Sequence, residues 1–226
     1  MKVVFDIDNT LIDYYGAERE GARKFGKMFA AQIPGYNRDR FCERWAELTQ
    51  REFERFLARE ISYEDQRLNR IRLIFDNPHM TDEEAWEYFS HYYNFYEQSW
   101  ELYDDVLECL GQLKARGIEM AVITDGAQIH QEKKLVNMGI REYFQFVLTA
   151  EGEGMVKPEA EFFLRAVNRF GSEPGDVIYV GDNLTKDARG ASGAGLIGVW
   201  LNRNGEEGDW ERTIDSLEGM SSFFSS

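Results

Sequence analysis

The chain has 226 residues, and its 26 lysines and arginines against 41 aspartates and glutamates give a net charge of −15 at pH 7. This length is enough for one large domain, or for a core with a sizeable insertion. The negative charge argues against binding to nucleic acid or to an anionic membrane surface, because both need basic patches. Hydrophobic residues make up 43% of the chain, too many for a disordered acidic protein.

Other features of the composition indicate a soluble, cytoplasmic protein. The two cysteines, Cys42 and Cys109, are far apart and form no CxxC pair, so we expect neither a disulfide framework nor a zinc site. Asp6 and Asp8 interrupt the apolar start of the chain, which is unlike a signal peptide. No apolar run approaches the roughly 18 residues of a membrane span. We expect a monomer or a homodimer.

Short apolar runs that end in glycine, aspartate or threonine occur at the start of the chain and again from about residue 118. With helical patterns between them, such runs are typical of buried parallel strands in βαβ units. The sequence therefore predicts an α/β fold, with a Rossmann-like parallel sheet flanked by helices. The expected strands cover residues 3–5, 120–123, 146–148, 177–180 and 196–200, and the helices between them cover about 127–138, 159–170 and 184–194.

The segment 14–100 has a different pattern, because its apolar residues recur at helical spacing, as in Phe25, Met28 and Phe29. Thr81 followed by Glu84 is the pattern of a capping box, which predicts a helix start there. We interpret 14–100 as a domain of about four amphipathic helices inserted after the first strand. The core domain then consists of residues 1–13 and 101–226.

Polar residues follow the ends of the predicted strands. Because a parallel sheet binds ligands at the carboxyl ends of its strands, we expect these residues to meet at one edge. The first strand leads into Asp6-Ile7-Asp8-Asn9-Thr10, the second into Thr124-Asp125-Gly126, the third towards Lys157-Pro158, and the fourth into Gly181-Asp182-Asn183, with Asp187 beyond.

A group of carboxylates without histidine or cysteine favours a hard cation, above all Mg²⁺, which commonly shares the oxygens of a substrate phosphate. Asp6 is then suited to attack phosphorus, and Asp8 to protonate the leaving oxygen and later activate water. The other phosphoryl oxygens would be held by Lys157, by Thr124, and by backbone N–H groups near Asn9 and Gly126. The pattern predicts phosphoryl transfer.

In these segments the sequence resembles the haloacid dehalogenase (HAD) superfamily. Asp6 to Thr10 is similar to its DxDxT motif, and Thr124-Asp125-Gly126 to its second motif. Lys157-Pro158 resembles the third motif, and Gly181-Asp182 through Asp187 the fourth, GDxxxxD. The resemblance extends over the core from residue 2 to about 201. The insertion 14–100 matches the family's helical C1 cap only in its position in the chain and in its helical spacing of apolar residues.

The resemblance implies a role for each matching residue. Asp6 matches the nucleophile and a Mg²⁺ ligand, and Asp8 the general acid and base, whose backbone carbonyl is another ligand. Asp182 matches a metal ligand, and Asp187 either a ligand or a support for one. Thr124 and Lys157 match the residues that bind phosphate. Asp125 lies beside them in the expected substrate-binding segment, but the family more often has Asn at its position.

These roles favour a Mg²⁺-dependent phosphatase that acts through an aspartyl-phosphate intermediate. A bulky helical lid over the site implies a small phosphorylated metabolite as the substrate. Three alternatives stay open: a phosphomutase of the β-phosphoglucomutase type, a 2-haloacid dehalogenase, and a phosphate-binding module without catalysis. The dehalogenase is disfavoured by Asp8, because a departing halide needs no proton.

Overall fold

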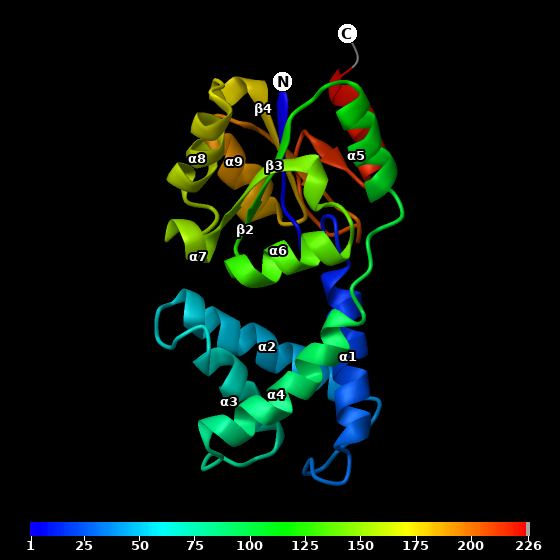
Figure 1. The fold of residues 1–226 in the computed structure, drawn as a ribbon, viewed down its shortest axis with the longest axis vertical. Helices are drawn as coiled ribbons and strands as arrows, with labels where there is room; N and C mark the ends of the chain where they lie inside the picture. Colours follow the sequence, from blue (N-terminus) through cyan, green and yellow to red (C-terminus); the bar gives the residue numbers. More distant parts are fainter. Residues whose placement is uncertain (225–226) are drawn as a thin grey trace. The chain divides into compact units, whose positions relative to one another are not determined.

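The computed structural model describes residues 1–224 and divides into two compact units (Figure 1). The first unit combines Met1–Asp13 with the chain from Glu101 onward, and the second is Tyr14–Trp100. None of the helices in residues 1–224 has the length and the apolar composition needed to cross a lipid bilayer. The polar residues singled out from the sequence all lie in the first unit.

The first unit is built on a parallel sheet, which confirms the predicted α/β fold class. Within residues 1–224 the sheet has six strands in the order β3-β2-β1-β4-β5-β6. The five predicted strands are present, and a short edge strand, β6, was not predicted. The strands are β1 (Lys2–Phe5), β2 (Met120–Thr124), β3 (Phe144–Thr149), β4 (Val177–Gly181), β5 (Ile197–Leu201) and β6 (Thr213–Ile214).

Both faces of the sheet are buried, as expected for parallel strands. Val3 and Phe5 of β1 join one apolar cluster, and Val4, on the opposite face, joins another. Figure 1 shows α5 on one side of the sheet and α8 with α9 on the other. The helices of this unit are α5 (Val106–Ala115), α6 (Gln128–Asn137), η1 (Arg141–Tyr143), α7 (Ala150–Glu153), α8 (Ala160–Phe170), η2 (Pro174–Asp176), η3 (Leu184–Arg189), α9 (Gly190–Gly193) and η4 (Leu217–Phe224).

The second unit is helical and has an aromatic core. Its helices are α1 (Tyr14–Met28), α2 (Phe41–Leu57), α3 (Asp65–Ile74) and α4 (Asp82–Glu97). The Phe25 ring lies 5.3 Å from that of Trp45 and 6.3 Å from that of Tyr92, between centroids. The predicted capping box begins α4, where the Glu84 N–H donates to Thr81 Oγ1 and the Thr81 N–H donates to Glu84 Oε2. That this unit acts as a cap stays a prediction.

The segment after β4 differs from the single helix expected over 184–194. It forms a π-helical turn, η3, followed by the short helix α9. Within this turn the N–H groups of both Asp187 and Ala188 donate to the carbonyl oxygen of Asn183. The wider turn directs the Asp187 side chain inward, where the Asn183 N–H donates to its Oδ2 at 2.9 Å. π-Turns of this kind are frequent at functional sites.

A partly buried ion pair joins the segment after β5 to the start of α5. Arg203, after β5, donates to both Asp105 oxygens, at 2.8 and 2.9 Å, and to the carbonyl oxygen of Thr10 at 3.0 Å. Asp105 also accepts from the Leu217 N–H at 2.8 Å. Burial alone would raise the pKa of Asp105, but these hydrogen bonds hold it below its ordinary value.

Replacing Asp105 by alanine is expected to lower the free energy of unfolding by about 3 kcal/mol, because it leaves a largely buried guanidinium without its carboxylate. Urea unfolding measures the change. The control is Glu161→Ala, which removes an exposed ion pair with Arg165 within α8 and should cost less than about 0.5 kcal/mol. Similar small losses for both variants would contradict this role of Asp105.

Candidate active site

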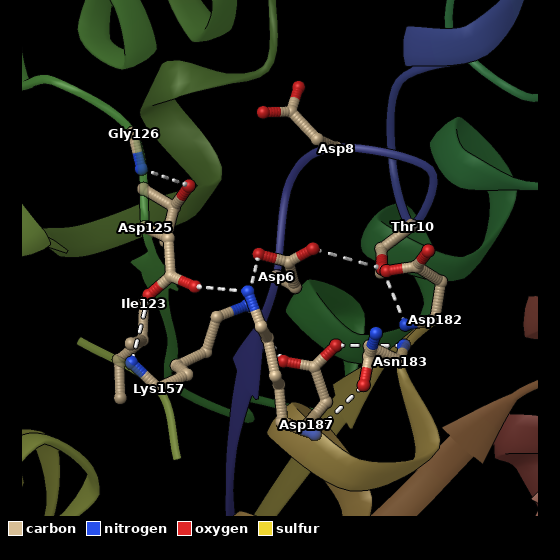
Figure 2. A network of polar contacts seen from close by, with 12 residues as sticks. Asp6, Asp8, Thr10, Ile123, Asp125, Gly126, Lys157, Asp182, Asn183 and Asp187 are labelled. Carbon is tan, nitrogen blue, oxygen red and sulfur yellow. Dashed lines mark hydrogen bonds and ion pairs between the residues drawn. The ribbon is translucent and has the colours of Figure 1, made fainter. Parts of the chain in front are cut away.

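Three acidic side chains meet at the carboxyl ends of β1 and β4. Asp6 follows β1, where its N–H donates to the Val180 carbonyl oxygen at 2.9 Å; Asp182 follows β4, and Asp187 lies in η3. One carboxylate oxygen from each of the three lies within 4.8 Å of the others. Figure 2 shows these side chains converging from the two strand ends. The adjacent parallel strands thus bring distant segments of the sequence to one place.

Lys157 lies between two of these carboxylates. Its Nζ is 2.7 Å from Asp6 Oδ1 and 2.7 Å from Asp187 Oδ1, and only 6% of the residue is exposed. Burial alone would lower the pKa of Lys157, but the charges of Asp187 and Asp6 hold it well above its usual value. The ammonium group is therefore charged, and it fixes the direction of the Asp6 carboxylate (Figure 2).

Asp187 is fully buried and held on both oxygens. Its Oδ1 accepts from Lys157 and, at 3.1 Å, from the Tyr179 hydroxyl, while its Oδ2 accepts from the Asn183 N–H. The glycine of the GDxxxxD motif makes this possible, because a Cβ on Gly181 would lie 2.4 Å from the Asp187 carboxyl carbon. Asp187 is thereby fixed to the backbone of the loop after β4 and to the lysine.

The cluster carries more negative charge than Lys157 neutralises. Burial raises the pKa of Asp6 well above its ordinary value, and the neighbouring Asp187 and Asp182 add to the rise against the opposing charge of Lys157. Burial, and then Asp187, raise the pKa of Asp182 to about 7. Because one ammonium group faces three carboxyl groups, a further cation at this place would favour the ionised forms of the carboxyl groups. The donor atoms are all oxygens, which suits a hard divalent ion.

Thr10, the threonine of the DxDxT motif, joins the ends of β1 and β4. Its Oγ1 accepts from the Asp182 N–H at 3.1 Å and lies 3.5 Å from Asp6 Oδ2, as the dashed lines of Figure 2 show. Thr10 was assigned no separate role from the sequence, although its place in the DxDxT motif was a signal. Its hydroxyl sets the spacing between Asp6 and Asp182.

The Asp8 carboxylate is directed away from Asp6 and Lys157 (Figure 2). It faces α6, where Lys134 Nζ lies 2.5 Å from Asp8 Oδ1 and Gln131 Nε2 lies 2.9 Å from Asp8 Oδ2. Neither α6 residue was predicted from the sequence, because none of the four motifs includes them. The one signal in the sequence was their place on the helix α6, which directly follows the second motif.

The second motif lies beside this group. Thr124 Oγ1, at the end of β2, accepts from Gln131 Nε2 at 2.9 Å and from the Gly126 N–H at 3.3 Å. Asp125 Oδ1 accepts from the backbone N–H of Lys157 at 2.9 Å, and Lys186 Nζ lies 3.7 Å from Asp125 Oδ2. Asp125 therefore holds the loop that carries Lys157, and Lys186 offsets its charge.

The backbone N–H groups of Asn9 and Gly126, at the segments expected to bind phosphate, donate to partners within the chain. The Asn9 N–H donates to the Ile12 carbonyl oxygen at 2.8 Å, and the Gly126 N–H donates to Thr124. That backbone N–H groups near Asn9 and Gly126 bind phosphate stays a prediction. Asn9 has a φ of 59°, a left-handed conformation that asparagine tolerates better than most residues, so it shapes the turn after β1.

Comparisons with known proteins agree with the motifs. The family model for haloacid dehalogenase-like hydrolases matches residues 3–195. A glyceraldehyde 3-phosphate phosphatase of Methanocaldococcus jannaschii is 38% identical over 52% of this chain and 54% of its own length. The first curated relatives are matched over only about half of their length. A ribulose-1,5-bisphosphate 5-phosphatase of Halopiger xanaduensis is 30% identical over 94% of this chain and 89% of its own length.

Solved structures with this fold match over almost the whole chain. The HAD hydrolase YfnB of Bacillus subtilis, bound to magnesium, has a TM-score of 0.81 at 22% identity, covering 98% of this chain and 97% of its own. An HAD phosphatase of Thermococcus onnurineus has a TM-score of 0.68 at 27% identity, covering 99% and 97%. With the family model matching most of its length, this chain belongs to the haloacid dehalogenase-like hydrolases.

Proposed function

We propose that this protein is a Mg²⁺-dependent phosphatase that hydrolyses phosphate monoesters of small metabolites. The observation that carries the proposal is the buried Asp6 carboxylate, held at 2.7 Å by Lys157 within the acidic cluster, with a second carboxyl on Asp8 two residues on. The relatives named as phosphatases support the same activity. These two relatives are named for small sugar phosphates, which favours a substrate of that size.

The donor set fits a magnesium ion. Asp6, Asp182 and the backbone carbonyl oxygen of Asp8 are the ligands that we propose, all of them hard oxygens. When bound, Mg²⁺ supplies positive charge to the carboxylates and to the phosphoryl oxygens. Asp187 lies within the same cluster, but its oxygens already accept three hydrogen bonds. We therefore assign Asp187 to holding Lys157 and the loop after β4.

In the first step a carboxylate oxygen of Asp6 attacks the phosphorus of the ester. The new bond joins Asp6 to phosphorus, and the bond from phosphorus to the alcohol oxygen breaks. The Asp8 carboxyl gives its proton to that oxygen, so the product leaves as an alcohol. Lys157, fixed between Asp6 and Asp187, offers its positive charge to the phosphoryl oxygens as negative charge develops on them.

In the second step a water molecule hydrolyses the aspartyl-phosphate. Asp8, now ionised, takes a proton from the water as its oxygen attacks phosphorus. The bond between phosphorus and Asp6 breaks, which releases inorganic phosphate and restores both carboxyl groups. The Thr124 hydroxyl accepts two hydrogen bonds from within the chain, so its own hydrogen is left to donate to a phosphoryl oxygen.

The helical unit Tyr14–Trp100 is proposed to serve as the cap that selects the substrate. We also place the enzyme in the cytoplasm, where small phosphorylated metabolites occur and where its free cysteines, Cys42 and Cys109, stay reduced. A mutase would yield an isomeric phosphate ester from the same site, so the release of inorganic phosphate separates the two activities.

The Asp6→Asn variant is expected to lose at least about 10³-fold in phosphate release, because an amide is not a nucleophile at phosphorus. Release is measured on a panel of small phosphate esters, including glycerol phosphate, phosphoglycolate and sugar phosphates, with Mg²⁺ and with EDTA. Wild-type release should require Mg²⁺. The Asp8→Asn protein should also gain the mass of one phosphoryl group when it is mixed with p-nitrophenyl phosphate, because this leaving group needs no proton while hydrolysis of the intermediate is slowed.

The matched control is Asp13→Asn, a neighbouring carboxyl outside the proposed machinery, which should keep its activity. Substantial phosphate release by folded Asp6→Asn would overturn the proposed nucleophile. A dehalogenase would instead release halide from a 2-haloacid and no phosphate from any ester. Thermal melting of each variant shows that it is folded.

Without a divalent cation, the stability of the protein is expected to fall as the pH rises from 5 to 8. The pKa of Asp182 is about 7 in the folded state and about 4 in the unfolded chain, so between these values the folded state binds more protons. Stability therefore decreases with pH in this window and levels off above it. Melting temperatures of protein treated with EDTA and then dialysed measure the slope.

Asp182→Asn should flatten this slope, because the amide does not titrate, whereas Asp176→Asn, at an exposed position, should leave it unchanged. Added Mg²⁺ should raise the melting temperature of the wild-type protein at pH 8. At a concentration 100 times its Kd, its binding would stabilise the folded state by about 2.7 kcal/mol. An equal slope in Asp182→Asn would contradict the assignment.

A further inference from the structure

One face of α6 carries two buried polar side chains three residues apart. Gln131 is 2% exposed and Lys134 is 3% exposed, whereas Lys133 and Val136 of the same helix are exposed. Residues three apart lie on one side of a helix, one turn from each other. A lysine is seldom fully buried unless its charge is paired. These two side chains therefore have a partner to which they are directed.

That partner is Asp8. Lys134 Nζ lies 2.5 Å from one carboxylate oxygen of Asp8, and Gln131 Nε2 lies 2.9 Å from the other. A single hydrogen bond would leave the carboxyl group free to rotate about its Cβ–Cγ bond, but one donor on each oxygen fixes its plane. Each oxygen still keeps a second lone pair, at which a proton can be carried and passed on.

Gln131 also reaches the second motif. The same Nε2 that donates to Asp8 lies 2.9 Å from Thr124 Oγ1. Gly126 leaves room for this amide, because a Cβ at Gly126 would lie 2.1 Å from Gln131 Nε2. The absence of a side chain at Gly126 therefore makes room for the Gln131 side chain from α6. Gln131 joins the Asp8 carboxyl to the Thr124 hydroxyl.

We propose that Lys134 and Gln131 are positioning residues for the proposed acid and base, Asp8. They hold its carboxyl group in one orientation, and Gln131 sets its place relative to Thr124, which is proposed to bind the phosphoryl group. One face of α6 would then hold the Asp8 carboxyl group, which donates the proton, in a fixed position relative to Thr124 and the phosphoryl group bound there. This inference rests on the proposed phosphatase activity.

The test compares two leaving groups. An alkyl phosphate must receive a proton as its alcohol leaves, whereas p-nitrophenyl phosphate releases a stable phenolate without one. In Lys134→Met, single-turnover cleavage of the fastest alkyl ester of the panel is expected to fall about 10²-fold, the scale of general acid catalysis. The first-turnover burst of p-nitrophenolate should stay close to the wild-type rate. Asp8→Asn should show the same pattern.

Two further variants serve as a control for charge and as a second test of the positioning role. Lys133→Met removes the same charge from the exposed side of α6 and should leave both rates unchanged. Gln131→Met replaces the second donor with a side chain of similar length, and it should show the same selective loss on the alkyl ester. It serves as the test if Lys134→Met does not fold, as judged by circular dichroism and thermal melting.

Equal losses on both substrates in folded Lys134→Met and Gln131→Met would overturn the inference, because a merely structural role affects both leaving groups alike. Unchanged rates on both substrates would overturn it as well. Failure of the proposed function has a different result, since the wild-type protein would then release no phosphate from any ester of the panel. If Asp6→Asn is inactive and only Asp8→Asn is selective, the function stands and the positioning role alone is wrong.

Discussion

The site depends on one buried ammonium group, that of Lys157. Leaving a single charge unpaired in the interior is costly, so its two carboxylate partners must be brought to it. They come from segments far apart in the sequence: Asp6 directly after β1, and Asp187 from the π-turn after β4, each 2.7 Å from Nζ. The parallel pairing of β1 with β4 places both segments at one edge of the sheet. The wide turn of η3 directs the Asp187 side chain inward, and the absence of a side chain at Gly181 leaves room for its carboxyl group.

The loops around this pair are held largely by side chains that bond to backbone groups. Thr10 binds the Asp182 N–H, Asp125 binds the Lys157 N–H, and Arg203 binds the Thr10 carbonyl oxygen. Such contacts fix the path of the chain without using the oxygens of Asp6 or Asp182. The carboxylate oxygens of Asp6 and Asp182 are proposed to bind a cation or a phosphoryl group. Other side chains therefore have to hold the loops in place.

The sequence was most informative where pattern and topology agree. Apolar runs ending in polar residues predicted the five main strands, and the parallel arrangement then predicted that Asp6, Thr124 and Asp182 lie at the same edge. Contacts between distant positions were out of reach. Gln131 and Lys134 look like ordinary polar positions of an amphipathic helix, and only the fold shows that their side of α6 faces Asp8. The same holds for the pairing of Asp105 with Arg203, and for β6, which has only two residues.

Asp6 and Asp8 are two residues apart and chemically identical, yet they are held by different lysines. Lys157, from the loop before α8, holds the carboxylate proposed as nucleophile, and Lys134, from α6, holds the carboxyl proposed as acid and base. The two environments also differ in exposure, since the Asp6 side chain is 7% exposed and that of Asp8 29%. A nucleophile must stay fixed and dry, whereas an acid and base must reach a leaving group and then a water molecule. The separation of the two lysines on different segments therefore lets one short motif supply two different chemical roles.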